Sequence, residues 1–399
     1  MVQTQKLFET NSHMTECAAK VLFCTYDEKK NTYAVVLDQT VFFPEGGGQF
    51  ADLGTLQVAN QGTTPNAITV SDVQIVDDVI YHYTDVPLEA DTIVTAKIDW
   101  SRRFDFMQQH SAEHIVSGLV YQKFGYHNVG FHLGLTETTL DFDGPLTPED
   151  IQWLEYEANQ AIYQNIAFDI SFPDKETLES LPYRSKKPLE GNIRIVTLPG
   201  YDICACCAPH VDCTGEIGVI KIVSFMAHRG GMRLTILCGS RALRDYQEKQ
   251  ISVEQISQLL SVKQPLVSQA VAKTKDDQLA LVTRINTLQA MLLDTVLSTL
   301  PAPSETENIL LFQKDLDMKA IRNAVNHLCA KYTGYCGIFV GTDETGYNFV
   351  LGSNTKDCTQ ISTLFKQNFG AKSGGSKPMI QGNVCAPQEA IKKALYPNG

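Results

Sequence analysis

The chain has 399 residues, of which 43% are hydrophobic and 20% are charged, so it is long enough for about two to four globular domains. Its formal net charge of −12 argues against bulk, non-specific binding to nucleic acid, because phosphate recognition depends on a cationic surface. No apolar run approaches the roughly 18 residues that a membrane span needs, and nothing near the N-terminus reads as a signal peptide. We therefore expect a cytoplasmic protein without a membrane partner.

The chain contains eleven cysteines. Four of them fall between Cys204 and Cys213. An odd and clustered set of this kind is typical of a reducing compartment with metal chemistry rather than of a disulfide scaffold.

We expect residues 1–95 to form a small β-barrel, because short β-branched and aromatic runs alternate there with clusters of Gly, Asn and Asp. The clearest runs are 33–37, 73–76 and 92–96. One turn, at 43–49, reads Phe-Pro-Glu-Gly-Gly-Gly-Gln, and its glycines permit close approach of the backbone to another group. Glu45 and Gln49 in this turn either face a binding pocket or only close a tight connection between strands.

Residues 96–245 change to an α+β pattern, in which apolar residues follow helical and strand periods in turn. The expected elements are helices at 110–119 and 148–165 and strands at 138–142, 193–196, 219–223 and 233–237. Together with the preceding barrel, this pattern predicts a multidomain α+β chain.

Residues 246–300 contain no glycine and predict a helical arm, either a hairpin or a coiled coil. Apolar residues recur at a spacing of three or four, which would form one stripe on a helix. They are Leu281, Ile285, Leu288, Leu292 and Val296. Pro265 stands near the start of the second helix of this arm. A homodimer through the arm or through the last domain is therefore possible.

Residues 301–399 predict a C-terminal α/β domain that follows a Pro-Ala-Pro linker at 301–303. The expected elements are a helix at 319–332, strands at 336–340 and 347–351, a Gly/Ser loop at 370–378 and a short final helix.

The most informative chemistry lies in two half-motifs inside the 96–245 segment. His110 and His114 are four residues apart on a predicted helix, so they share one face and can approach the same metal ion. Roughly ninety residues later, Cys206 and His210 show the same spacing in a turn that Pro209 stiffens. Three imidazoles and one thiolate are a favourable set for tetrahedral Zn²⁺, so the two halves together predict a zinc site.

The sequence does not decide which cysteine supplies the sulfur ligand of this site. Cys207 is the main rival of Cys206, and Cys204 or Cys213 could substitute.

The order and spacing of several runs resemble a known domain. His110-Ser-Ala-Glu-His114 is followed by Val129-Gly-Phe-His-Leu-Gly134 and by Cys206-Cys-Ala-Pro-His-Val211, with Thr214-Gly-Glu-Ile-Gly218 directly downstream. This pattern resembles the editing domain of alanyl-tRNA synthetases and of their free-standing relatives.

Two further segments extend the resemblance. The turn at 43–49 is similar to the glycine-rich barrel motif that precedes the editing domain in the longer free-standing forms. Ser373-Gly-Gly-Ser-Lys-Pro378 is similar to a glycine-rich loop in the C-terminal domain shared by alanyl-tRNA synthetases and DHH-type phosphoesterases.

The resemblance implies hydrolysis of the ester that joins a wrong amino acid, serine or glycine, to the 3′ end of alanine tRNA. It also implies one zinc ion, which either activates water or organises the pocket. Neither an ATP-binding signature nor enough remaining chain for an aminoacylation domain is found, so the protein would edit in trans.

Three residues are candidate catalytic groups: Glu113, His132 and Gln49. Glu113 lies between the two helical histidines but about 100° from His114 around the helix, so it is a base, a partner of a ligand or a surface carboxylate. His132 follows a turn and either faces the substrate or stands at a strand end as a structural histidine.

Contacts to tRNA must come from local basic clusters, because the chain as a whole is acidic. The candidates are Arg184, Lys186, Lys187, Arg229, Arg233, Lys372 and Lys377. Each cluster alone is more often a solvated surface than a binding site.

Two other functions stay open. His110-Ser-Ala-Glu-His114 also fits the inverted zinc-peptidase motif, with Glu113 as the base and a downstream acid such as Glu190 as a ligand. Alternatively, the metal is structural and the chain is a non-catalytic tRNA-binding protein.

Overall fold

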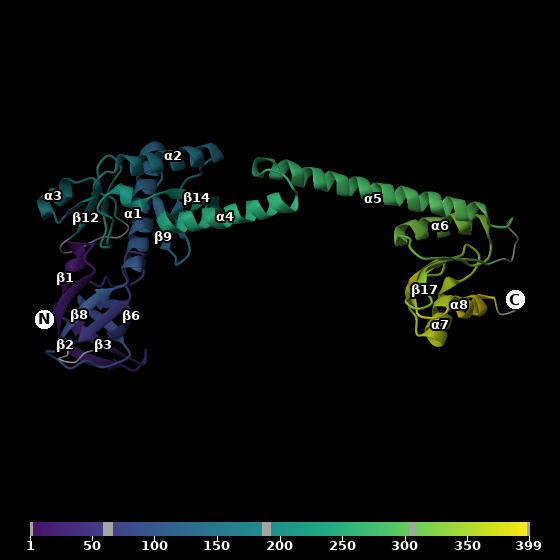
Figure 1. Cartoon of the computed structure of the whole chain (residues 1–399), viewed down its shortest axis with the longest axis horizontal. Coiled ribbons are helices and arrows are strands. Elements are labelled where there is room, and N and C mark those ends of the chain that lie inside the picture. Colours follow the sequence, from purple (N-terminus) through teal and green to yellow (C-terminus); the bar gives the residue numbers. More distant parts are fainter. Residues whose placement is uncertain (1–2, 59–66, 186–192, 303–307, 397–399) are drawn as a thin grey trace. The chain divides into compact units, whose positions relative to one another are not determined.

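The computed structural model describes residues 3–58, 67–185, 193–302 and 308–396, and the chain is a mixed α+β, multidomain protein (Figure 1). Two compact units, residues 1–252 and 253–399, make up the chain. Within the described ranges, no helix combines the length and the apolar composition that crossing a membrane requires.

The first part of unit 1 is a closed barrel, as the sequence predicts. In barrel order its strands are β2 (Glu16–Asp27), β3 (Thr32–Leu37), β7 (Val79–Thr84), β6 (Ala67–Val76), β5 (Gly54–Val58) and β8 (Ile93–Ile98). Apolar side chains of the strands fill the interior, among them Val35, Leu56, Val70, Ile80 and Val94. Strand β8 runs across the boundary that the sequence pattern put at residue 95. A short parallel pair, β1 (Gln5–Lys6) and β4 (Gln39–Thr40), and the 3₁₀ turn η1 (Leu7–Glu9) complete this part.

Helix α1 (Trp100–Phe124) leads out of the barrel and is the centre of unit 1 (Figure 1). The Asp99 side chain caps its first turn by accepting a hydrogen bond from the Arg102 amide, and Gly125 ends it in a left-handed conformation. Every residue from Phe106 to Val120 is buried. The stretch of α1 that is buried on all sides has no single apolar stripe, so periodicity did not show how far the helix extends beyond the predicted residues 110–119.

A buried ion pair joins α1 to the barrel. The Arg103 guanidinium forms a bidentate pair with the Asp52 carboxylate, and both side chains are fully buried. Arg103 also donates to the carbonyl oxygens of Ser12 and Val41, while Asp52 accepts a hydrogen bond from the Phe43 amide. Several protein groups thus partner the buried pair, and α1 is fixed on the segment that follows the glycine-rich turn.

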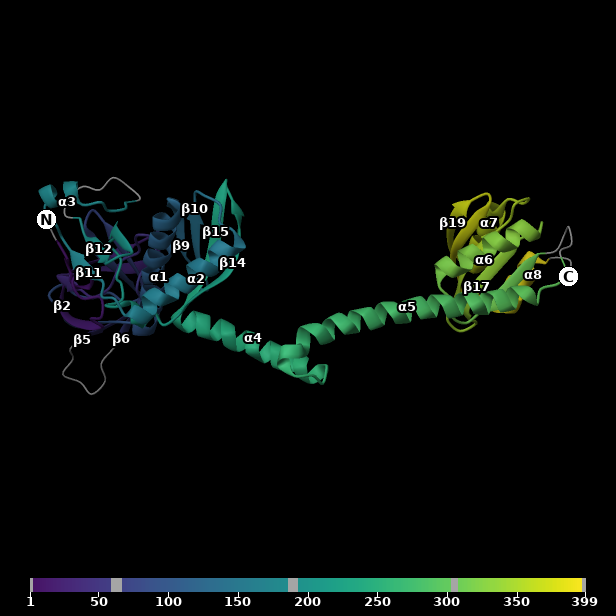
Figure 2. The ribbon, with the colours of Figure 1, turned by 90° about the horizontal axis from the view of Figure 1, so that it is seen from above.

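Two antiparallel sheets and two helices surround the rest of α1. The first sheet, against which α1 and α2 (Pro148–Gln164) pack, has the order β14 (Ile220–His228), β15 (Gly231–Cys238), β10 (Thr138–Phe142), β9 (Asn128–Leu133) (Figure 2). The second has the order β11 (Asp169–Ser171), β12 (Ile195–Leu198), β13 (Asp202–Ala205), and is accompanied by α3 (Lys175–Ser180) and the turn η2 (Thr214–Ile217).

The β12–β13 hairpin lies directly against α1. A Cβ atom on Gly118 would stand only 2.3 Å from the Tyr201 carbonyl oxygen, so the helix and the hairpin approach more closely here than any larger residue permits. This approach brings the residues that follow β13 over the histidines of α1.

The predicted arm consists of α4 (Gly239–Leu259), the 3₁₀ turn η3 (Gln264–Leu266) that contains Pro265, and the 32-residue α5 (Val267–Ser298). Helix α4 begins before the boundary predicted at residue 245. Four side chains of the apolar stripe on α5 are 47–63% exposed: Leu281, Ile285, Leu288 and Leu292. Pairing of this stripe in a coiled coil or with a second copy of the chain stays a prediction.

The C-terminal domain is a five-stranded sheet with helices on both faces. The strand order is β16 (Ile309–Gln313), β17 (Cys336–Thr342), β18 (Gly346–Gly352), β20 (Met379–Val384), β19 (Lys372–Ser376). Helix α6 (Met318–Lys331) packs on one face, while α7 (Cys358–Phe369) and α8 (Gln388–Leu395) pack on the other.

The prediction of a Gly/Ser loop at 370–378 is wrong, because Lys372–Ser376 forms the edge strand β19. Two glycines permit this close pairing. A Cβ atom on Gly375 would lie 2.3 Å from the Met379 carbonyl oxygen, and one on Gly382 would lie 2.2 Å from that of Lys372. Gly and Ser have little intrinsic preference for strands, so backbone pairing with β20 overrides the local composition.

Candidate metal centre

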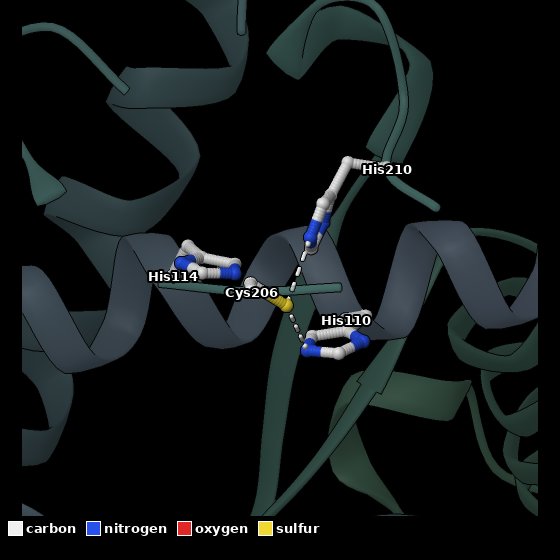
Figure 3. Close-up of side chains that lie close together, drawn as sticks. All are labelled: His110, His114, Cys206 and His210. Carbon is white, nitrogen blue, oxygen red and sulfur yellow. Dashed lines mark hydrogen bonds between the residues drawn. The ribbon is translucent and has the colours of Figure 1, made fainter. Parts of the chain in front are cut away.

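Four side chains from two distant segments meet at the middle of α1 (Figure 3). His110 and His114 project from one face of the helix, and Cys206 and His210 come from the loop that follows β13. One ligand atom of each residue lies within 4.8 Å of the others. All three histidines are buried, so the cluster is shielded from bulk water.

The geometry of this cluster fits a tetrahedral zinc ion. The Cys206 Sγ lies 3.6 Å from His110 Nε2 and 3.4 Å from His210 Nε2. Zinc–ligand distances of about 2.0–2.3 Å place tetrahedral ligand atoms about 3.5 Å from one another. His114 Nε2 is buried without a hydrogen-bond partner among the described residues, as expected for an atom that binds metal. The residues present therefore fit one Zn²⁺.

The other candidate thiols lie outside the cluster. Cys207 points toward the glycine-rich turn, where its Sγ would stand 3.4 Å from a Cβ atom on Gly47. Burial raises the pKa of Cys207 to about 11 and raises that of Cys204 still further, so both favour the thiol form. The backbone of Cys213 pairs with that of Ala167 in an isolated antiparallel β-bridge. Of the four thiols, only that of Cys206 lies among the three imidazoles.

Each clustered histidine is oriented through its second ring nitrogen. His110 Nδ1 lies 3.1 Å from Gln49 Oε1, and His210 Nδ1 lies 3.3 Å from Ser111 Oγ. His114 Nδ1 donates to Asp202 Oδ2 at 2.7 Å, because an ionised carboxylate can only accept. Such partners fix the tautomer and the ring orientation of metal-binding histidines.

The glycine-rich turn of the barrel forms one side of this centre. Gly46 and Gln49 exchange backbone hydrogen bonds, and Gly47 and Gly48 between them have φ angles of 61° and 85°, which glycine adopts without strain. A Cβ atom on Gly48 would stand 3.0 Å from the ring of Phe131, so a larger residue would push the turn away. The turn thereby holds the Gln49 side chain, which is 1% exposed, against His110.

A network of charged and polar side chains surrounds His114 and its hydrogen-bond partner Asp202. Arg184 forms two hydrogen bonds with the Asp202 carboxylate, of 2.9 and 2.7 Å, and further contacts of 3.3 and 3.4 Å with the Glu113 carboxylate. Glu113 Oε1 also accepts from Ser117 and Asn128, and its Oε2 lies 3.9 Å from His114 Nε2. Glu113 is therefore a buried carboxylate beside the ligand cluster, and the surface interpretation of this residue is wrong.

The four clustered side chains differ in the protonation state that their surroundings favour. Burial opposes the charged form of Cys206, but the neighbouring His110 and His210 hold the pKa of this thiol well below its usual value. Burial lowers the pKa of His210 to about 3, which keeps its imidazole neutral. For His114, burial alone would lower the pKa, yet the hydrogen bond to Asp202, with Cys206 and Glu113 nearby, raises it to about 9. Metal binding by His114 would therefore require the loss of this proton.

We expect Asp202→Asn to lower zinc affinity by about 10- to 100-fold, because the amide cannot stabilise the ligand tautomer of His114 as a carboxylate does. Competition with a chromogenic chelator measures this affinity. Asp169→Asn, on the exposed edge strand β11, is the matched control and should leave it unchanged. Equal affinities of Asp202→Asn and the parent would mean that Asp202 does not orient the ligand.

The remaining predicted residues are placed as follows. His132 lies on β9 with its side chain exposed, while its neighbour Phe131 stands against His110 at a ring distance of 4.9 Å. The alternation of side chains along a strand thus turns Phe131, and not His132, toward the ligand cluster.

The predicted basic residues have different surroundings. Arg184 is engaged by Glu113 and Asp202, and Arg233 pairs with Asp141 at 2.6 Å, so both charges are matched within the protein. Arg229 lies at the tip of the β14–β15 hairpin, and Lys372 and Lys377 are exposed on and after β19. Lys186, Lys187 and Glu190 lie outside the described residues.

Sequence reasoning missed several residues that shape the centre: Asp202, Ser111, Asn128, Phe131 and Arg194. Arg194 is buried and donates to the carbonyl oxygens of Cys206 and Ala208, so it holds the loop that carries the thiol. The one available signal was that Arg194 and Asp202 are charged residues within otherwise apolar strand patterns, where a charge needs a partner.

Comparisons with known proteins agree with this arrangement. Residues 3–102 match the family described as tRNA synthetases class II (A), and residues 193–234 match the threonyl and alanyl tRNA synthetase second additional domain. The second match contains both Cys206 and His210.

Individual relatives extend the similarity along the chain. The alanyl-tRNA editing protein Aarsd1 of Rattus norvegicus is 27% identical over 358 residues, which cover 88% of this chain and 84% of the relative. Aarsd1-B of Xenopus laevis is 33% identical over 230 residues, or 54% of this chain and 52% of the relative. The alanine tRNA ligase of Pyrococcus furiosus is 33% identical over 270 residues, which cover 65% of this chain but 28% of the ligase.

Proposed function

Because this chain is homologous to the alanyl-tRNA editing proteins along most of its length, we propose that it is an aminoacyl-tRNA hydrolase that edits alanine tRNA in trans. The substrate would be alanine tRNA charged with serine or glycine, and one Zn²⁺ would be the cofactor. The observation that carries this proposal is the buried cluster of three imidazoles and one thiolate, with Gln49 and Glu113 beside it.

In this proposal His110, His114, Cys206 and His210 hold the metal. With four protein ligands, zinc would polarise the ester or hold the amino end of the substrate only by accepting a fifth ligand, and otherwise would organise the pocket. The ester is already activated by the neighbouring ribose hydroxyl, so the protein has mainly to position a water molecule and the acyl group.

Glu113 is the proposed general base. Its Oε2 lies 3.9 Å from His114 Nε2, on the side of the ligand cluster. Hydrogen bonds from Ser117 and Asn128 and the charge of Arg184 favour the ionised carboxylate, which can accept a proton from an attacking water. The proton then passes to the departing ribose oxygen.

Gln49 is the proposed donor to the substrate. Its Oε1 is used by His110, whereas its Nε2 is buried and has no hydrogen-bond partner among the described residues. An unsatisfied buried donor costs about 1–3 kcal/mol, which a bound acceptor such as the ester carbonyl oxygen would recover. As negative charge develops on that oxygen, the same hydrogen bond strengthens.

The proposal is tested by deacylation of alanine tRNA charged with serine, glycine or alanine, by the zinc-loaded full chain. We expect release of serine or glycine well above the spontaneous rate, while correctly charged alanine tRNA is spared. Metal-loaded protein that accelerates no deacylation would reject the proposal and favour the non-catalytic, tRNA-binding alternative. Cleavage of peptides instead of the ester would point to the zinc-peptidase alternative.

A further inference from the structure

The residues before the barrel, Leu7–His13, lie against the segment 206–216, which carries two of the four clustered side chains. We call the first segment the N-terminal strap and the second the ligand loop. The barrel anchors the start of the strap, because Phe8 is 3% exposed and its ring lies 5.5 Å from that of Phe43. The pairing of β1 with β4 holds the residues directly before it. The strap therefore leaves the barrel from a fixed position.

Arg194 connects the strap to the start of the ligand loop. Its Nε donates to the Glu9 carbonyl oxygen at 3.1 Å, and its Nη1 donates to the carbonyl oxygens of Cys206 and Ala208, both at 2.9 Å. The side chain is 5% exposed, so these hydrogen bonds are largely shielded from competing water. Because a guanidinium offers its donors in a rigid planar fork, one side chain holds the strap and the loop in a fixed relation.

His13 connects the strap to the far end of the ligand loop. Its Nε2 lies 2.9 Å from Glu216 Oε2, and its Nδ1 lies 3.1 Å from Asp212 Oδ1. The ring also lies against α1, with centroid distances of 5.3 Å to Trp100 and 6.5 Å to Phe104. The strap thus reaches the loop on both sides of the two clustered side chains that the loop carries.

Helix α1, which carries the other two clustered side chains, holds the ligand loop at its middle and at its far end. The Val211 amide donates to Ser111 Oγ at 3.2 Å, and Gln108 Nε2 donates to the Glu216 carbonyl oxygen at 2.8 Å. The carbonyl oxygens at the start of the loop are held by Arg194 instead and, through it, by the strap. The position of the thiol relative to the helical histidines therefore depends on this connection.

We propose that the N-terminal strap, through Arg194 and His13, positions the ligand loop for metal binding, so that retention of the metal depends on a segment 185 residues earlier in the chain than Arg194. A loop that is already in place loses little conformational entropy when the ion binds, and groups behind metal ligands commonly change metal affinity by about 10- to 100-fold. Arg194 and His13 are positioning residues, since neither is one of the four clustered side chains. The inference rests on the metal-binding part of the proposed function and not on the reaction.

The first test measures the rate at which the zinc-loaded full chain loses its metal to an excess of a chromogenic chelator. We expect Arg194→Lys to release zinc about tenfold faster than the parent, because an ammonium group cannot span the three carbonyl oxygens that the guanidinium holds. Arg241→Lys is the matched control, since Arg241 is 7% exposed but binds Asp105 and the Gly134 carbonyl oxygen and not the loop. A release rate in Arg194→Lys equal to that of the parent would overturn the proposal.

His13→Ala tests the other end of the strap and, with a partly exposed side chain, should fold even if Arg194→Lys does not. We expect zinc release about threefold faster, an effect of the size that one partly exposed ion pair has. His127→Ala is its control, because His127 lies 3.3 Å from the Asp143 carboxylate and does not contact the loop. Parent-like release in His13→Ala would contradict a role of the strap beyond the contact at Arg194.

The second test needs neither metal nor activity, and follows hydrogen exchange of the ligand loop in the metal-free full chain. The Cys206 amide donates to the Arg194 carbonyl oxygen at 3.2 Å, a backbone contact that Arg194→Lys leaves in place, so its exchange reports opening of the loop. We expect amides 206–211 to exchange about tenfold faster in Arg194→Lys, because about two hydrogen bonds that hold the loop are lost, and to be unchanged in Arg241→Lys.

The outcomes separate this inference from the proposed function. If the loop exchanges equally in Arg194→Lys and the parent, the strap does not hold it and the inference fails, even where the parent hydrolyses mischarged alanine tRNA. If the loop exchanges faster in Arg194→Lys but the parent hydrolyses no mischarged tRNA, the inference stands and the proposed function fails.

Discussion

Cys206→Ala is expected to reduce bound zinc from one ion per chain to a small fraction and to lower the deacylation rate by about a thousandfold. The thiolate is the only sulfur among the three imidazoles, and its negative charge offsets that of the metal. Removal of a metal that stabilises the transition state costs several kcal/mol, and each 1.36 kcal/mol corresponds to a factor of ten in rate. Metal analysis after gel filtration and single-turnover deacylation measure the two effects.

Cys207→Ala is the matched control, since it removes the adjacent thiol, which points toward the glycine-rich turn. It should retain zinc and most of the activity. The opposite result, with metal lost in Cys207→Ala and kept in Cys206→Ala, would transfer the ligand role to Cys207. Full zinc content in both variants would mean that no thiolate at this turn binds the metal.

Asp52→Ala is expected to lower the free energy of unfolding of unit 1 by about 3–5 kcal/mol. The substitution leaves the Arg103 guanidinium fully buried without its carboxylate, and an uncompensated buried charge is far more costly than a lost surface pair. The two tryptophans of the chain, Trp100 and Trp153, both belong to unit 1. Their fluorescence during urea denaturation therefore reports the unfolding of this unit separately from unit 2.

Asp72→Ala provides the comparison for this effect. Its partner Lys30 also lies on the barrel, but both side chains are a third or more exposed, so loss of the pair should cost less than about 1 kcal/mol. If Asp52→Ala and Asp72→Ala lowered the stability equally, the Arg103–Asp52 pair would not be what joins the barrel to α1.

Most of the fold could be predicted from local patterns. Period-two alternation and turn residues identified the barrel, and the strand at 138–142 matches β10 residue for residue. Helix α1 extends well beyond its prediction because burial on all sides removes the apolar stripe on which helical periodicity depends. Strand β19 was missed because Gly and Ser form it only through pairing with β20.

In the candidate site, too, features set by local sequence could be predicted, and contacts between distant segments could not. The two pairs of side chains in the cluster were predictable, because a spacing of four residues is local information, and their role as metal ligands stays a prediction. The partners of these ligands were not, since Asp202 reaches His114 from a hairpin 88 residues later in the chain. His132 was a candidate because an imidazole can take part in catalysis, but the direction of a strand side chain depends on register, which one sequence does not reveal.

The separation of the two half-motifs also sets an order of assembly during synthesis. Cys206 follows His110 by 96 residues, so the ribosome must first make β9, β10 and all three strands of the second sheet before all four side chains exist. The barrel strands are synthesised earlier and can close first, since domains generally fold as units from the N-terminus. Helix α1, which needs neighbours on every side, remains incompletely packed until β13 and the later strand β15 have been made. A metal ion held by these four side chains would therefore enter only after more than half of this unit has been made.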